Sequence, residues 1–196
     1  MLNKKQKEQR SLRKKSILEG ALKVFKIHGI EKTTMDEIAI ESGFGKATLY
    51  YYFTSKDEVF IAIMEDGWKK LWEGIESKIV EELGPRKKFM GIIKTMANIV
   101  KNNKILYGFL FTAPNHIQDE SKQIWKTYQE RLYAILKSII EEGIKKKEFI
   151  DLDPGMLMKA IGGLFHGLLI ENKDNLDDRD FELMLRNFLR PENAKS

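Results

Sequence analysis

Apolar residues recur at spacings of three and four through almost the whole chain of 196 residues, and this periodicity limits its fold. The first stripe is Leu18, Ala21, Leu22 and Phe25, which share one face of a helix. No segment of useful length alternates apolar and polar residues as a half-buried strand would. The sequence also has no internal repeat. The pattern predicts an all-α fold.

Glycines mark the ends of two of the three short predicted helices near the start of the chain. The first ends at Gly29, because glycine readily takes the left-handed conformation that caps a helix. The segment 34–37 matches a capping box that opens the second helix, which ends at Gly43. The third runs from about residue 45 to 53. Three short helices joined by tight turns predict a helix-turn-helix unit.

The rest of the chain also has helical spacing. A second capping box at 55–58 opens a longer helix that reaches at least Leu71. Prolines fall at the edges of the later segments, where a helix tolerates them. The predicted later helices are 86–103, 104–113, 117–146, 154–172 and 177–189.

Composition excludes several classes of protein. The chain has no cysteine, which excludes disulfides, thiol catalysis and cysteine-ligated metal sites. Its basic first residues are not followed by an apolar run, so they do not form a secretory signal. No run approaches the roughly 18 apolar residues that a membrane span needs. We expect a cytoplasmic protein with no membrane partner.

Positive charge is concentrated at the start of the chain. Residues 1–56 hold 12 Lys and Arg against 6 Asp and Glu, a net +6, and the remainder holds 22 against 23, a net −1. This asymmetry indicates an anionic partner for the first module, with nucleic acid ahead of a membrane surface. The alternative is a basic face that is simply solvated.

Three consecutive tyrosines close the third predicted helix. Successive helical residues point about 100° apart, so the three rings cannot share one surface. Leu49 and Phe53 are four residues apart and are predicted to hold the helix on the first two. Tyr50 and Tyr51 then face outward, with Tyr52 at the boundary. Exposed tyrosines indicate a partner, because the hydroxyl can bond a phosphate and the ring can contact a thymine methyl.

Lys56 gives a second indication of an anionic partner. A cation in the first turn of a helix opposes the helix dipole. A phosphate bound at that N-terminus would reconcile the lysine with the dipole. The alternative is that the long side chain extends into water.

The segment 154–172 is apolar on nearly every face, which predicts burial on all sides. One face is then expected on the core and another on a partner subunit. The alternative is a core helix of a monomer. The residues assigned to a dimer interface are Leu157, Ile161, Gly163, Leu164, Gly167, Leu168, Phe181, Met184, Leu185 and Phe188.

The second part of the chain is rich in aromatic side chains and methionine, which would suit a pocket for an apolar or planar molecule. Ordinary core packing is the alternative for each of these side chains. The candidate ligand-binding residues are Trp72, Tyr107, Phe111 and Trp125.

Nothing in the sequence pairs a nucleophile with a base. His28, His116 and His166 belong to no metal-binding or catalytic pattern. The segment 43–45 begins like a dinucleotide-binding loop, but Thr48 replaces the last glycine and no strand precedes it. We expect no catalytic residue, no metal and no cofactor.

The segment TTMDEIAIESGFGKATLYYYF (33–53), with the first helix before it and Ser-Lys-Asp-Glu at 55–58 after it, resembles the N-terminal domain of the tetracycline-repressor (TetR) family. The resemblance covers about residues 10–60. It implies an all-helical homodimer whose DNA-binding domain spans 1–56, with its motif at 34–53. A larger helical domain, 57–196, is then expected to bind a ligand and form the dimer.

The resemblance also implies roles for single residues. Thr34 would contact a phosphate at the start of the second helix. The residues facing the groove would be Lys46, Thr48 and Tyr51. The residues contacting the DNA backbone would be Tyr50, Tyr52 and Lys56. The basic tail before residue 15 would either add phosphate or minor-groove contacts or be a disordered solubilising tail.

The expected function is therefore sequence-specific regulation of transcription. The resemblance implies a nucleoid-associated repressor that leaves a pseudo-palindromic double-stranded operator when a hydrophobic small-molecule effector of unknown identity binds. One alternative is a ligand-insensitive or corepressor-dependent DNA-binding protein. Another is a helical small-molecule binder whose basic N-terminus meets an acidic partner other than DNA.

Overall fold

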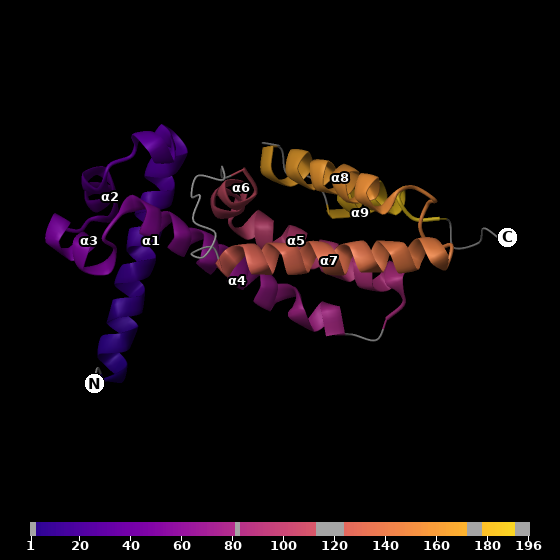
Figure 1. Ribbon diagram of the computed structural model, residues 1–196, viewed down its shortest axis with the longest axis horizontal. Helices are drawn as coiled ribbons and strands as arrows, with labels where there is room; N and C mark the ends of the chain where they lie inside the picture. Colours follow the sequence, from indigo (N-terminus) through magenta and orange to yellow (C-terminus); the bar gives the residue numbers. More distant parts are fainter. Residues whose placement is uncertain (1–2, 81–82, 113–123, 172–177, 191–196) are drawn as a thin grey trace. The chain divides into compact units, whose positions relative to one another are not determined.

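The structure is a computed structural model that describes residues 3–80, 83–112, 124–171 and 178–190 (Figure 1). Within these ranges the only extended pairing is one antiparallel bridge between Phe149 and Leu189. The prediction of an all-α fold is confirmed. The helices are α1 (Lys4–Lys32), α2 (Met35–Ser42), α3 (Lys46–Tyr52), α4 (Lys56–Val80), α5 (Pro85–Asn102), α6 (Lys104–Thr112), α7 (Ile124–Lys145), α8 (Pro154–Phe165), the π-helical η2 (His166–Glu171) and α9 (Asp178–Arg186).

The chain forms two compact units, and the division falls inside α4. Unit 1 runs to Asp66, and unit 2 begins at Gly67. The first turns of α4 therefore belong with α1, α2 and α3. The predicted domain boundary at 56/57 instead coincides with the start of α4.

Unit 1 is held together by apolar side chains from all of its helices. Ile17, Ala21, Ile38 and Leu49 are each fully buried, and Phe53 is almost so. The predicted inward pair on the third helix is thereby confirmed. These side chains fix α2 and α3 against the second half of α1, which positions the outer face of α3.

The predicted helix ends in unit 1 are also confirmed. Gly43 caps α2 in the left-handed conformation, with φ 74°. Gly29 has φ 75° and ψ 160°, so the regular part of α1 ends there although helical bonding resumes as far as Lys32. The basic tail is helical, because Asn3 caps α1 and forms a reciprocal box with Gln6.

The backbones of α1 and α2 approach each other closely at Gly20. A Cβ atom at this position would lie 2.8 Å from the Ser42 Cα and 2.8 Å from the Ser42 backbone nitrogen. Backbone atoms cannot rotate away as a side chain can. Glycine at position 20 therefore sets how closely the two helices cross.

Unit 2 is a bundle in which α5 packs on α7, α7 packs on α8, and η2 packs on α5 and α6. Its core includes the fully buried Phe89, Ile92, Phe149 and Leu157. The predicted helix 154–172 changes to a π-helix at His166, which its periodicity did not indicate. Residues 117–123 of the predicted helix 117–146 lie outside the described residues. No helix in the described part of the chain is long and apolar enough to span a membrane.

Candidate functional site

The outer face of α3 carries the tyrosines. Tyr51 is 69% exposed and Tyr50 is 49% exposed, whereas Leu49 is fully buried. Tyr52 is half-buried, and its ring meets the Tyr51 ring edge to face with centroids 5.2 Å apart. The division of the three rings between surface and boundary is as predicted. Because large exposed aromatic side chains are uncommon on a purely solvated surface, this face is suited to contact a partner.

Two cations of α1 lie beside α3. The Arg10 guanidinium carbon is 5.8 Å from the centre of the Tyr51 ring. The Lys14 amino nitrogen is 5.6 Å from the centre of the Phe53 ring. These distances are within the range of cation–π attraction. The surface around α3 is therefore aromatic and positively charged, which suits an anionic polymer with flat bases.

Thr34 caps α2 as predicted. Its hydroxyl donates to the Glu37 carboxylate over 2.8 Å and accepts the Glu37 backbone N–H over 3.3 Å. The Thr34 backbone N–H donates to the same carboxylate over 2.7 Å. Both hydrogen bonds from Thr34 lower the pKa of Glu37. The bond from the backbone N–H has the larger effect, and the bond from the hydroxyl follows. The stabilisation they give is present at neutral pH and is lost only as acid protonates the carboxylate.

Lys46 begins α3 and is paired with Asp36 of α2. Their side-chain nitrogen and oxygen are 2.5 Å apart, and both side chains are mostly exposed. An exposed pair of this kind contributes at most about 1 kcal/mol, so a phosphate or base can replace it. Thr48, one turn short of Tyr51, is half-buried. The groove contacts of Lys46, Thr48 and Tyr51 and the phosphate contact of Thr34 stay predictions.

Lys56 makes hydrogen bonds within unit 1 that the sequence did not predict. Its amino group donates to the backbone carbonyls of Ile30, Glu31 and Thr33 over 3.0, 2.7 and 3.3 Å. An ammonium has three protons, so these three bonds employ all of them. A cation at the C-terminal end of α1 also favours the dipole of that helix. The predicted contact of Lys56 with the DNA backbone stays a prediction.

The two roles of Lys56 are separable by substitution. We expect Lys56→Met to lower the free energy of unfolding by about 1–3 kcal/mol, because the helix-end carbonyls lose a charged donor. If Lys56 serves only these carbonyls, the slope of log affinity for DNA against log salt should stay unchanged. Thermal unfolding and a salt titration on random duplex measure the two quantities. A slope that fell by about one unit would show a phosphate contact instead.

Of the two hydrogen bonds that the predicted capping box at 55–58 implies, one is formed as predicted and the other has a different donor. The Glu58 backbone N–H donates to the Ser55 hydroxyl over 3.2 Å, so the box begins α4. The Glu58 carboxylate, however, accepts the N–H of Thr54 rather than that of Ser55. The carboxylate thereby fixes the turn between α3 and α4.

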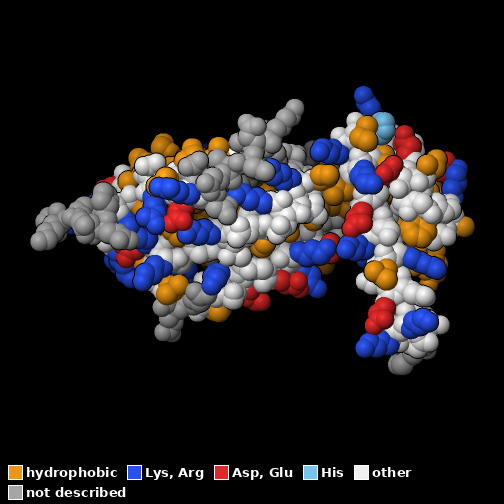
Figure 2. Space-filling view, turned by 180° about the vertical axis from the view of Figure 1, so that it is seen from behind, with side chains coloured by type: hydrophobic (Ala, Val, Ile, Leu, Met, Phe, Trp, Pro, Cys, Tyr) orange, Lys and Arg blue, Asp and Glu red, His pale blue; other side chains and the backbone are white. Residues whose placement is uncertain are grey.

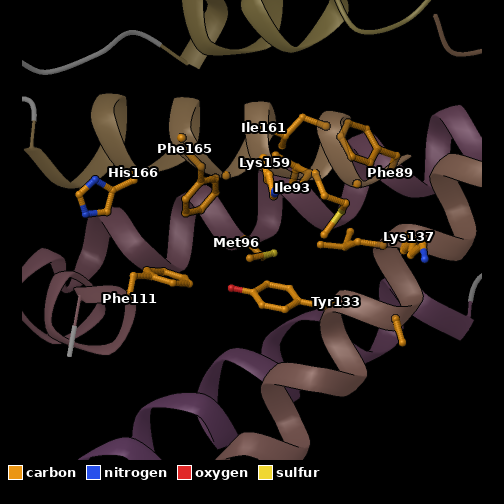
Figure 3. A pocket seen from close by; sticks show the side chains of 16 residues that line it. Phe89, Ile93, Met96, Phe111, Tyr133, Lys137, Lys159, Ile161, Phe165 and His166 are labelled. Carbon is orange, nitrogen blue, oxygen red and sulfur yellow. The ribbon is translucent and has the colours of Figure 1, made fainter. Parts of the chain in front are cut away.

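A pocket of about 660 Å³ lies within unit 2, between α5, α6, α7 and α8 (Figure 3). Its wall is mainly apolar and includes Phe89, Met96 and Phe111. Figure 3 shows His166 at one end of the hollow and Lys137 at the other. The volume falls within the range of about 300–1,000 Å³ that is usual for small-molecule sites.

Of the four predicted ligand-binding residues, Phe111 lines this pocket and the other three do not. Trp72, Tyr107 and Trp125 are each buried elsewhere in unit 2. The Arg131 guanidinium covers the Trp72 ring at 4.4 Å. The indole N–H of Trp125 has no hydrogen-bond partner among the described residues. A ligand role for these three stays a prediction.

The residues predicted for a dimer interface divide by burial. Three of them are buried in the core of unit 2 and have little surface left to contact a partner. They are Leu157, Ile161 and Leu185. Six others keep exposed surface: Gly163, Leu164, Gly167, Leu168, Met184 and Phe188. The side chain of Phe181 lies outside the described residues. Ile161 and Gly163 also line the pocket.

Sequence reasoning missed the polar part of the pocket. Tyr133 and Lys137, four residues apart on α7, and Lys159 on α8 all line it. A Cβ added at Gly162 or Gly163 would meet nothing within 4 Å, so these glycines border open space within the described structure. The unusual density of glycine at 155–167 was a usable signal. The sequence analysis instead assigns two of these glycines, Gly163 and Gly167, to the dimer interface.

Two family models match the chain. Residues 17–63 match bacterial regulatory proteins of the tetR family. Residues 82–169 match the tetracyclin repressor-like C-terminal domain. The first match contains α2, α3 and the start of α4, and the second contains the helices that form the pocket.

Individual relatives agree with these matches. The HTH-type transcriptional regulator YfiR of Bacillus subtilis (strain 168) is 29% identical over 161 residues, which cover 76% of this chain and 73% of YfiR. A TetR family regulator, PfmR, from Thermus thermophilus has a similar fold, with TM-score 0.70 and 22% identity over 85% of this chain and 91% of PfmR. AibR, solved with isovaleryl coenzyme A and operator DNA, has TM-score 0.75 and 19% identity over 91% of this chain and 99% of AibR.

Proposed function

Because the chain belongs to the tetR family of bacterial regulatory proteins, whose members regulate transcription by binding DNA, we propose that it is a ligand-released repressor. As a homodimer it binds a pseudo-palindromic operator through α3 of each subunit. It leaves the operator when a hydrophobic small molecule occupies the pocket of unit 2.

The observation that carries this proposal is the outer face of α3. Tyr50 and Tyr51 are exposed on a short helix whose other face is locked into a core by Leu49. The second helix of such a motif enters the major groove, with its first residues at base edges. Lys46 stands at that end of α3, in an exposed ion pair that DNA can replace.

The dimer is proposed to use the exposed surface of α8 and α9. Met156, Leu183 and Met184 are exposed apolar side chains of these helices. A twofold dimer would place two α3 helices about 34–36 Å apart, or a multiple of that, to meet two half-sites. An effector that favoured another separation would weaken binding, because ligands shift a protein toward the conformation that they bind best.

The effector is proposed to have an apolar body and an anionic group. The wall of the pocket is mainly apolar, and two lysines, Lys137 and Lys159, line it. AibR was solved with isovaleryl coenzyme A. Its similarity of fold does not identify a ligand, but acyl coenzyme A thioesters and free fatty acids combine the two chemical features and are the first probes.

Binding to DNA tests the regulator proposal directly. We would titrate the purified protein onto the DNA immediately upstream of its own gene and onto random duplex, across a salt series. A tight, sequence-dependent complex at moderate salt is the expected result. If weak binding were equal on both duplexes and vanished with salt, selection from random sequences would follow. The proposal fails if that selection also yields no preferred sequence.

Filling the pocket tests the effector site. We expect Gly162→Leu to weaken binding of any active probe at least about tenfold, or 1.4 kcal/mol, while operator binding is retained. A Cβ atom at position 162 would meet nothing within 4 Å, so the new side chain begins in open space. Ala160→Leu is the matched control, because Ala160 is exposed on the same helix and does not line the pocket. Isothermal titration calorimetry gives the affinities. Unchanged probe affinity in Gly162→Leu would place the effector elsewhere.

A further inference from the structure

The first 13 residues of α1, 4–16, form a helical extension whose side chains are all exposed. Residues 4–15 hold seven Lys or Arg against Glu8 alone, a net +6 that exceeds the +5 of the whole chain. Figure 2 shows Lys and Arg side chains along this extension. The matched family segment begins only at residue 17. The shared helix-turn-helix core therefore does not account for this charge.

One face of the extension is fixed toward α3. Arg10 lies over the Tyr51 ring at 5.8 Å, and Lys14 lies over the Phe53 ring at 5.6 Å. Each helical residue turns about 100°, so Lys7 shares the face of Arg10 and Lys14. The three cations therefore form a row on the side of α1 that faces the exposed tyrosines. The start of α1 extends beyond α2 and α3 (Figure 1).

The row needs a negative partner. Like charges at spacings of three and four repel and destabilise a helix. None of the three cations has a carboxylate among the ion pairs of the described residues, in contrast to Lys15, which is 3.8 Å from Glu19. The rise of about 1.5 Å per residue gives the row from Lys7 to Lys14 a length of about 10 Å. Each DNA strand carries one phosphate per about 3.4 Å of axis, so the row can face two or three phosphates.

We propose that Lys7, Arg10 and Lys14 form a second DNA contact, which binds the phosphate backbone beside the groove that α3 enters. This inference rests on the proposed function, because it takes α3 as the element that enters the groove. Phosphate contacts carry no sequence information. The extension therefore adds affinity and fixes orientation, while α3 selects the sequence.

Two double variants of the full chain test the proposal. Lys7→Gln with Arg10→Gln removes two charges of the row. Lys5→Gln with Lys15→Gln is the matched control, since these residues point about 160° and 120° away from the direction midway between Arg10 and Lys14. Glutamine is a good helix former, so circular dichroism should show equal helix content in all proteins.

The readout is the slope of log affinity against log salt on operator and on random duplex, measured by fluorescence anisotropy. We expect the row variant to reduce the slope by about two on both duplexes and to leave the ratio of the two affinities unchanged. The control variant should reduce the slope by less than half of the reduction seen in the row variant.

Three results would overturn the proposal. The first is an equal effect of both variants, which would make the extension a diffuse cationic tail. The second is no effect of either. The third is unchanged slopes together with loss, in the row variant, of binding to vesicles of anionic phospholipid. If the wild type failed to prefer any duplex, the proposed function would fail, yet the slope on random duplex would still report the phosphate contact.

Discussion

Tyr51→Ala should lower affinity for the operator by between about fivefold and a hundredfold and leave affinity for random duplex nearly unchanged. A contact to a base edge is worth about 1–3 kcal/mol, and it is lost only on the sequence that it recognises. Because Tyr51 is 69% exposed, its removal should not alter the stability of unit 1. Parallel anisotropy titrations on the two duplexes measure the change in specificity.

Two further variants locate the source of the Tyr51 effect. Tyr51→Phe keeps the ring below Arg10 and removes only the hydroxyl, so it separates a hydrogen bond from a ring contact. Tyr50→Ala is the neighbouring comparison and should weaken both duplexes alike if Tyr50 contacts only the backbone. Equal losses on operator and random DNA for Tyr51→Ala would show that Tyr51 does not select sequence.

The largest expected loss of stability comes from Leu49→Ala, at about 2–5 kcal/mol. Leu49 is fully buried and is the buried residue of α3 itself, so a cavity there removes the contact that holds α3 in place. DNA binding should fall in proportion to the fraction of unit 1 that is unfolded. Chemical denaturation followed by circular dichroism measures the stability, and a separate early transition would identify unit 1.

The controls for Leu49 lie at the same place in the chain. Leu49→Met conserves most of the volume and should cost less than about 1.5 kcal/mol. Tyr50→Ala, one residue along and half exposed, should change stability by less than about 0.5 kcal/mol. If Leu49→Ala were as stable as Tyr50→Ala, the division of α3 into an inner and an outer face would be wrong.

Local chemistry made unit 1 predictable. The capping box joins Thr34 to Glu37, three residues later. The left-handed cap at Gly43 bonds to Ala39 and Ile40, at most four residues earlier. The inward pair Leu49 and Phe53 follows from helical periodicity alone. Asn3 and Gln6 were a similar signal, which shows that the basic tail is the start of α1 and not a disordered segment.

Long-range contacts were not predictable in the same way. Lys56 bonds to carbonyls that precede it by 23 to 26 residues, and no local pattern specifies which groups the fold brings to it. Burial also does not distinguish a ring that lines a void from one that packs in the core. Trp72 and Phe111 are both aromatic residues of segments with helical spacing, and the sequence gives no reason to assign them different roles. Of the two, only Phe111 lines the pocket.

Unit 1 has one region that tolerates substitution, the outer face of α3, and one that does not, the crossing of α1 and α2 at Gly20. A single methyl group there would meet the backbone at Ser42. Tyr50 and Tyr51 on the outer face of α3, by contrast, are exposed. New operator preferences are therefore open to change by substitution at positions such as 48, 50 and 51. The spacing between α1 and α2 is constrained, by contrast, because even the Cβ of an alanine at position 20 would lie 2.8 Å from backbone atoms of Ser42, so the backbone would have to shift.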